Sequence, residues 1–166
     1  METISLKSED LSKHGQCRIR RNLFAAFAEA CKTHGKSKAI LTDGDGKTFT
    51  YAEIMRAAFA LSSPLKKYSQ RNEAVGILLP TGAGAVISLF ALHAVGRIPA
   101  MLNFSAGVQN LKAAAQTGQL KSIVTARKFI ELGGLSALIE ALSGDCLLYT
   151  SPSPRDLSTS RMPSSA

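Results

Sequence analysis

The sequence predicts an α/β fold in which a short β-hairpin precedes a βαβαβα unit with a parallel sheet. From residue 74 onward, short apolar runs of strand length alternate with longer segments whose apolar residues recur at helical spacing. Strands and helices that alternate in this order favour a parallel sheet covered by helices. Further upstream, the turn residues of 43–46 (Asp-Gly-Asp-Gly) separate two β-prone runs, 39–42 and 47–50, and predict a hairpin.

Two helices are expected before the parallel sheet. Asn22 can cap a helix that reaches about residue 34. Thr50 and Glu53 form a capping box at the start of the second helix, because each side chain can satisfy a backbone N–H that the first turn leaves free. We expect this helix to run to about Leu61 and to end before Pro64, which cannot donate a helical hydrogen bond.

The parallel unit is expected to contain three strands and the helices that follow them. The predicted strands are 74–79, 98–102 and 122–125, and the predicted helices are 83–95, 107–117, 126–132 and 135–142. Ser105 and Thr125 have side chains that suit N-caps, so they are expected to start the helices at 107 and 126. Gly96 is expected to end the helix before it.

The chain is basic, with a formal net charge of +8. A basic surface can attract phosphates, an acidic carrier protein or anionic lipid. Part of the charge is clustered at Arg18, Arg20 and Arg21, in a polar leader or linker over residues 1–21. A basic docking domain without enzymatic activity is therefore one alternative. Nucleic acid is not expected as a partner, because aromatic residues are few and do not alternate with the basic ones.

The turn 80–84 (Pro-Thr-Gly-Ala-Gly) is the one candidate for a phosphate site. A glycine-containing turn at a helix N-terminus can present backbone N–H groups to a phosphate. A small Rossmann-like nucleotide-binding module that uses Gly82 and Gly84 is therefore a second alternative. However, Ile87 stands where the dinucleotide fingerprint has its third glycine, and no acidic residue follows about 20 positions on. Close packing of the helix on the sheet is the favoured explanation of these glycines.

The remaining potentially reactive side chains have no second residue at a spacing that would form a catalytic or metal site. His93 lies on an apolar helix without a second ligand nearby and is interpreted as a core or interface histidine. Cys31 is expected to be a buried thiol, and cysteine spacing indicates neither a disulfide framework nor a metal site. We therefore assign no catalytic, cofactor-binding or metal-binding residue. A signal peptide is not evident, so a reducing, cytoplasmic location is expected.

Three motifs resemble those of a known family. Residues 48–54 (Thr-Phe-Thr-Tyr-Ala-Glu-Ile) resemble the early Leu-Thr-Tyr-x-Glu-Leu motif of the adenylate-forming, AMP-binding acyl synthetases, and residues 73–80 and 90–103 are similar to the strand and second motif that follow. Residues 97–108 and 121–127 are similar to a narrower group, the bacterial acyl-[acyl-carrier-protein] synthetases fused to 2-acylglycerophosphoethanolamine acyltransferase. The resemblance covers about residues 22–142.

The resemblance implies the N-terminal part of that family's fold and an ATP-dependent ligase. In the family, a fatty acid reacts with ATP and Mg²⁺ to give acyl-adenylate, and the acyl group passes to acyl carrier protein and then to a lysophospholipid. This chemistry implies a place at the inner face of the bacterial inner membrane for the full-length protein. The family's phosphate cradle lies downstream of the matched region, so we expect this truncated piece to be inactive and to hold no cofactor.

The composition changes abruptly after Asp145. Read back into codons, residues 146–151 fit the end sequence of a sequencing-library transposase, and residues 152–156 and 160–166 fit the adapter that accompanies it. We interpret 146–166 as translated adapter, a disordered tail outside the domain at 22–145. Residues 149–151 (Tyr-Thr-Ser) are similar to the start of the synthetase phosphate loop but lack its glycines and lysine.

Overall fold

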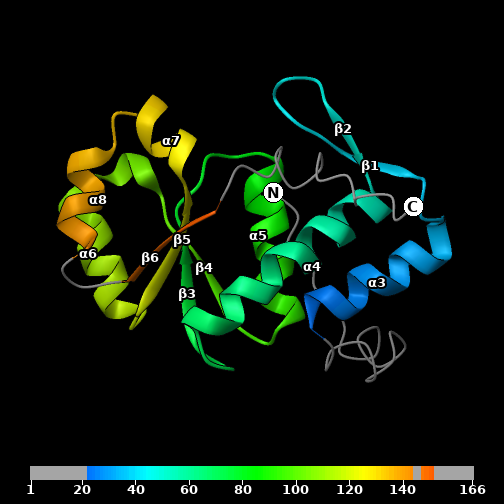
Figure 1. Cartoon of the computed structure of the whole chain (residues 1–166), viewed down its shortest axis with the longest axis horizontal. Coiled ribbons are helices and arrows are strands. Elements are labelled where there is room, and N and C mark those ends of the chain that lie inside the picture. Colours follow the sequence, from blue (N-terminus) through cyan, green and yellow to red (C-terminus); the bar gives the residue numbers. More distant parts are fainter. Residues whose placement is uncertain (1–21, 144–146, 152–166) are drawn as a thin grey trace, which may run out of the picture.

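The computed structural model describes residues 22–143 and the backbone of residues 147–151 (Figure 1). A parallel sheet lies in the middle, with α3, α4 and α5 on one face and α6 and α8 on the other. Each face has its own apolar cluster, so the central strands are buried on both sides. The structure confirms the predicted α/β class, with the hairpin ahead of the parallel unit.

The first helix and the hairpin form as predicted. In α3 (Leu23–His34), the Asn22 side chain accepts a hydrogen bond of 2.8 Å from the N–H of Ala25. The hairpin strands β1 (Ala39–Thr42) and β2 (Thr48–Thr50) pair antiparallel. Phe27 of α3 packs its ring 4.1 Å, between centroids, from the ring of Phe90. This contact attaches α3 to α5.

Helix α4 (Tyr51–Tyr68) begins with the predicted capping box. The Thr50 N–H donates to Glu53 Oε2 at 2.8 Å, and the Glu53 N–H donates to Thr50 Oγ1 at 3.3 Å. The expected end before Pro64 is wrong, because the helix continues for four residues beyond it. The cost of the missing N–H is offset by burial, since Leu61 and Leu65 are 3% and 2% exposed in the apolar cluster under α4.

The parallel unit has the predicted order of strands and helices. Its strands lie in the order β4-β3-β5-β6, and every neighbouring pair is parallel. The bounds of its elements are β3 Ala74–Ile77, α5 Ala83–Ala94, β4 Ile98–Met101, α6 Val108–Thr117, β5 Ser122–Ala126, α7 Arg127–Leu132, α8 Ser136–Ser143 and β6 Leu147–Ser151.

Two predicted N-caps are wrong. Ser105 lies inside a short 3₁₀ turn (Phe104–Ala106), where its N–H and hydroxyl both donate to Asn103 Oδ1, and Gly107 precedes α6. Thr125 belongs to β5, which extends to Ala126, so α7 starts without a side-chain cap. At Ser105 the competing interaction is the local hydrogen bonding to Asn103, and at Thr125 it is strand pairing. Each keeps the residue out of the N-cap position.

Strand β6 differs from the expectation that residues 146–166 lie outside the fold. Its backbone pairs with β5 in register from Ser122↔Leu147 to Ala126↔Ser151. An exposed strand edge offers unpaired N–H and C=O groups to any β-prone segment, so this pairing does not depend on the origin of the segment. The predictions for 1–21, including the arginine cluster at Arg18, and for 152–166 fall outside the described residues. The adapter origin stays a prediction.

The capping box gives a stability prediction. Thr50→Ala removes the cap acceptor for the Glu53 N–H, and we expect it to lower the free energy of unfolding by about 1 kcal/mol in urea titrations at pH 7. Thr117→Ala, at the exposed end of α6, is the control and should change it by less than about 0.5 kcal/mol. Equal effects of both substitutions would contradict the role of the cap.

The same box predicts an acid dependence. Hydrogen bonds from the Thr50 backbone and side chain lower the pKa of Glu53 below 4.5. The stabilisation is therefore present above pH 4.5 and is lost as the pH falls through the lowered pKa. Glu53→Gln should flatten the fall of the unfolding midpoint between pH 5 and 3. An unchanged slope would show that the carboxylate does not contribute.

Candidate functional site

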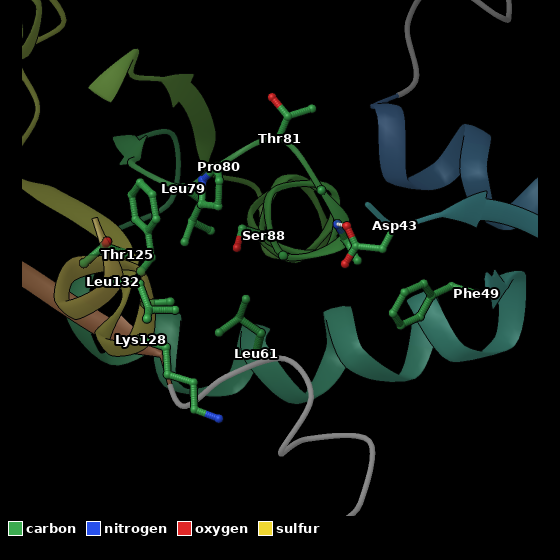
Figure 2. A pocket seen from close by; sticks show the side chains of 15 residues that line it. Asp43, Phe49, Leu61, Leu79, Pro80, Thr81, Ser88, Thr125, Lys128 and Leu132 are labelled. Carbon is green, nitrogen blue, oxygen red and sulfur yellow. Dashed lines mark hydrogen bonds between the residues drawn. The ribbon is translucent and has the colours of Figure 1, made fainter. Parts of the chain in front are cut away.

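A cavity of about 300 Å³ lies at the carboxyl ends of β3 and β5 (Figure 2). In parallel α/β sheets, ligands bind in the crevice outside this end of the strands. Its walls come from the hairpin, α4, the β3–α5 turn, α5, the end of β5 and α7. The lining residues are Asp43, Phe49, Leu61, Leu79, Pro80, Thr81, Gly82, Ala83, Gly84, Ser88, Thr125, Ala126, Lys128, Phe129 and Leu132.

Two buried hydroxyl-bearing residues belong to the walls of this cavity. Ser88 on α5 is 2% exposed, and Figure 2 shows its hydroxyl directed into the open space. Thr125 at the end of β5 is fully buried, and its Oγ1 has no hydrogen-bond partner within the described part of the chain. A buried hydroxyl without a partner keeps its full desolvation cost. The two hydroxyls therefore provide unused hydrogen-bonding capacity in an otherwise apolar space.

Asp43 occupies the N-terminal end of α5. The Ala83 N–H donates to Asp43 Oδ1 at 3.4 Å, and the Gly44 N–H donates to the same oxygen at 2.9 Å. A Cβ at Gly82 would lie 2.6 Å from that oxygen, so a larger residue there would require the Asp43 side chain to move. The carboxylate stands where a phosphate would bind, and it would repel a second anion. The geometry thus gives no support to a phosphate site at Gly82 and Gly84.

The sequence did not indicate this role of Asp43. We interpreted Asp43 as a turn residue, and its contact with Ala83 joins residues 40 positions apart. Turn chemistry is local, whereas this contact depends on how the hairpin packs against α5. The glycine at 82 was visible in the sequence, but the side chain that requires it was not.

His93 and Cys31 lie away from the cavity. His93 is half-buried at the end of α5, where burial lowers the pKa of its imidazole, and its carbonyl accepts a hydrogen bond from the Asn22 amide. Cys31 is 3% exposed, which confirms the buried thiol. Within residues 22–143, no group of three His, Cys, Asp or Glu side chains is placed to hold a metal. In the same described part, no helix is both long and apolar enough to cross a bilayer.

Arg97 is a buried residue that the sequence analysis did not single out. Its guanidinium donates from Nε to Ser69 Oγ at 3.0 Å, from Nη2 to the Ser69 carbonyl and from Nη1 to the Val95 carbonyl. Ser69 Oγ in turn donates to the Leu65 carbonyl at 2.7 Å. These bonds fasten the end of α4 to the start of β4. Arg97 is thus a structural clamp at the amino end of β4, whereas the cavity lies at the carboxyl ends of β3 and β5.

The chain belongs to the AMP-binding enzyme family. The model of that family matches residues 27–161, which is most of the sequence. The match runs past Asp145 into the segment that we interpret as translated adapter. The fold described above is the one that the family resemblance predicted.

Several solved structures share the fold. VinN has a TM-score of 0.66 at 18% identity and aligns with 84% of this chain and 35% of its own. The N-terminal subdomain of Klebsiella oxytoca NpsA, in complex with 3-hydroxybenzoyl-AMSN, has a TM-score of 0.66 at 14% identity, with 86% and 32% covered. The anthranilate CoA ligase AuaEII, in complex with anthranoyl-AMP, has a TM-score of 0.68 at 19% identity, with 82% and 26% covered. This chain therefore spans about a third or less of these proteins.

The orphan hydroxyl of Thr125 gives a testable prediction. Thr125→Val removes a buried polar atom that has no partner, so it should raise the free energy of unfolding by about 1 kcal/mol. Ser69→Ala is the contrast, because this buried hydroxyl has partners and its loss leaves an Arg97 donor unpaired. It should lower the same free energy by about 1–3 kcal/mol. A destabilised Thr125→Val variant would contradict the assignment.

Proposed function

We propose that this chain is the N-terminal part of an ATP-dependent fatty acid:acyl-carrier-protein ligase that serves lysophospholipid reacylation. The observation that carries the ligase class is the family match over residues 27–161 together with the shared fold. The assignment of a fatty acid as substrate and acyl carrier protein as acceptor depends on residues 97–108 and 121–127. These residues resemble the synthetases that are fused to an acyltransferase.

The proposed chemistry proceeds through an acyl-adenylate. AuaEII, which shares the fold, is solved with anthranoyl-AMP, an intermediate of this kind. Formation of an adenylate needs positive charge and usually Mg²⁺ at the reacting phosphates. The described residues do not fit that demand, because they hold no metal-binding group of acidic or histidine side chains and Asp43 occupies the α5 N-terminus. We therefore assign no catalytic step to them.

Within this proposal, the part of the enzyme seen here is a scaffold. The capping box at Thr50 lies in the first family motif, and the Arg97 clamp lies in the second. Both motifs thus correspond to structural hydrogen bonds. Their effect on activity would come through the stability of the sheet, whose carboxyl edge faces the cavity.

The charge of the chain supports the proposed acceptor. Its formal net charge is +8, and a basic surface speeds association with an acidic carrier protein and with anionic lipid headgroups. The full-length enzyme would work in the cytoplasm, at the inner face of the bacterial inner membrane.

The 166-residue chain should be inactive alone. Incubated with ATP, Mg²⁺ and a fatty acid, the purified chain is expected to release no pyrophosphate above a protein-free control. It should also show no binding in an ATP titration by calorimetry. Pyrophosphate release that depends on the fatty acid would show that the chemistry is complete within this chain.

The ligase itself is tested with the longer gene. Genomic DNA read across the codons of Asp145 and Cys146 should show a reading frame that encodes a glycine-rich phosphate loop. The protein expressed from that frame should release pyrophosphate with a fatty acid and load the acyl group onto acyl carrier protein. Loading of coenzyme A instead would replace the proposed acceptor, and absence of adenylate formation would refute the ligase.

A further inference from the structure

The amino ends of β3, β4 and β5 lie together, at the end of the sheet opposite the cavity. The Ile98 N–H donates to the Glu73 carbonyl at 3.0 Å, and the Asn72 N–H donates to the Gly96 carbonyl at 2.8 Å. Glu73 also reaches β5, because its Oε1 accepts a hydrogen bond of 3.5 Å from the Ser122 hydroxyl. Figure 1 shows the last turn of α4 beside this end of β3. The end of α4, the turn before β4 and the start of β5 therefore form one surface.

The exposed side chains of this end combine positive charge with apolar area. We define the amino-end surface as its exposed basic, aromatic and aliphatic residues, which are Lys66, Lys67, Tyr68, Arg71, Ile98 and Lys121. Tyr68 is 46% exposed and Ile98 is 55% exposed, so a ring and an aliphatic side chain meet water among four positive charges. The acidic residue beside them, Glu73, is engaged within the turn, where its Oε2 accepts from the Gln70 N–H at 2.8 Å.

The Arg71 side chain is held against the turn before β4. Gly96 has a φ of 71°, and a Cβ there would lie 3.4 Å from Arg71 Cγ and 3.5 Å from its Nε. The aliphatic stem of Arg71 is thus packed on the backbone while the residue remains exposed. This contact places a positive charge beside the start of β4, where Ile98 is exposed.

An anionic lipid surface fits these side chains. Basic residues close to a membrane are attracted to anionic headgroups, and a tyrosine suits the boundary because its ring is apolar and its hydroxyl is polar. An acyl carrier, in contrast, has to bring its thiol to the crevice at the carboxyl ends of the strands, which is the opposite end of the sheet. A membrane at the amino end would leave that crevice open.

We propose that the amino-end surface docks this protein on an anionic lipid membrane, with the cavity directed away from the lipid. Lys66, Lys67, Arg71 and Lys121 contact the headgroups, and Tyr68 and Ile98 enter the interface. The inference rests on the proposed function only for the membrane location, which it deepens by naming the surface and the orientation.

The binding test is cosedimentation of the 166-residue chain with vesicles of phosphatidylcholine that contain about 30 mol% phosphatidylglycerol. Replacing both Lys66→Gln and Lys67→Gln should lower the partition coefficient about tenfold at about 0.05 M salt. The difference should shrink at about 0.5 M salt, because ions screen the attraction. Vesicles of phosphatidylcholine alone should bind the unchanged chain at least about tenfold more weakly.

A matched control removes the same charge from the other end of α4. The carbonyls of Lys36 and Lys38 accept hydrogen bonds from the N–H groups of Ala52 and Tyr51, at the start of this 18-residue helix. This position is about 25 Å from Lys66 and Lys67. Replacing both Lys36→Gln and Lys38→Gln should therefore lower the partition coefficient by less than about twofold.

Tryptophan fluorescence tests the orientation, because the chain contains no tryptophan of its own. In Tyr68→Trp, anionic vesicles should shift the emission to the blue, and brominated lipid should quench it, since the new ring enters the interface. Ile40→Trp places a ring on the hairpin, where Ile40 is 36% exposed, and should show neither effect.

Three results would overturn the proposal. One is an equal loss of vesicle binding in the two double variants, which would trace binding to net charge alone. Another is cosedimentation without a blue shift in Tyr68→Trp, which would place the contact elsewhere. The third is binding of acyl carrier protein, and not of vesicles, that the Lys66 and Lys67 substitutions abolish. Pyrophosphate release by the longer protein tests the ligase separately, so failure of one proposal is distinguishable from failure of the other.

Discussion

The structure depends on the burial of β3 between two apolar clusters. This strand pairs with β4 on one side and β5 on the other, so both of its edges and both of its faces are covered. Gly76 makes the close contact of the layers possible, because a Cβ there would lie 3.0 Å from both Ile123 and Leu102 side-chain atoms. A strand of this kind has no surface left for polar side chains, which is why the sequence reads as an uninterrupted apolar run. The helices on the two faces, and through them the hairpin and the cavity, are positioned by that strand.

Local sequence rules succeeded where the deciding interaction is local. The capping box at Thr50 joins residues three positions apart, and the alternation of apolar runs reflects which face of each element is buried, so both were predictable. The same rules failed at Pro64 and Thr125, where distant packing decides. Leu65 keeps α4 helical beyond the proline because it is buried, and strand pairing holds Thr125 in β5. Neither influence can be read from neighbouring residues.

The cavity was the least predictable part for a related reason. It forms where the hairpin, α4, α5, β5 and α7 meet, and no short motif spans these segments. Asp43 illustrates the difficulty, since its turn was predicted while its contact with the α5 N-terminus was not. The glycines at 82 and 84 suggested a phosphate in the sequence, yet in the fold one of them makes room for a carboxylate. A glycine-containing turn therefore indicates that another group lies close to the backbone, and only the structure shows which group it is.

The main-chain pairing at the edge of β5 also indicates where segments of related proteins can be joined to make chimeras. Residues 147–151 occupy this edge through main-chain pairing in continuous register. A position that is held by the backbone places few demands on side chains. The junction after Asp145 is for that reason a suitable crossover point for chimeras, in which the remainder of one synthetase is grafted onto the first sheet of another.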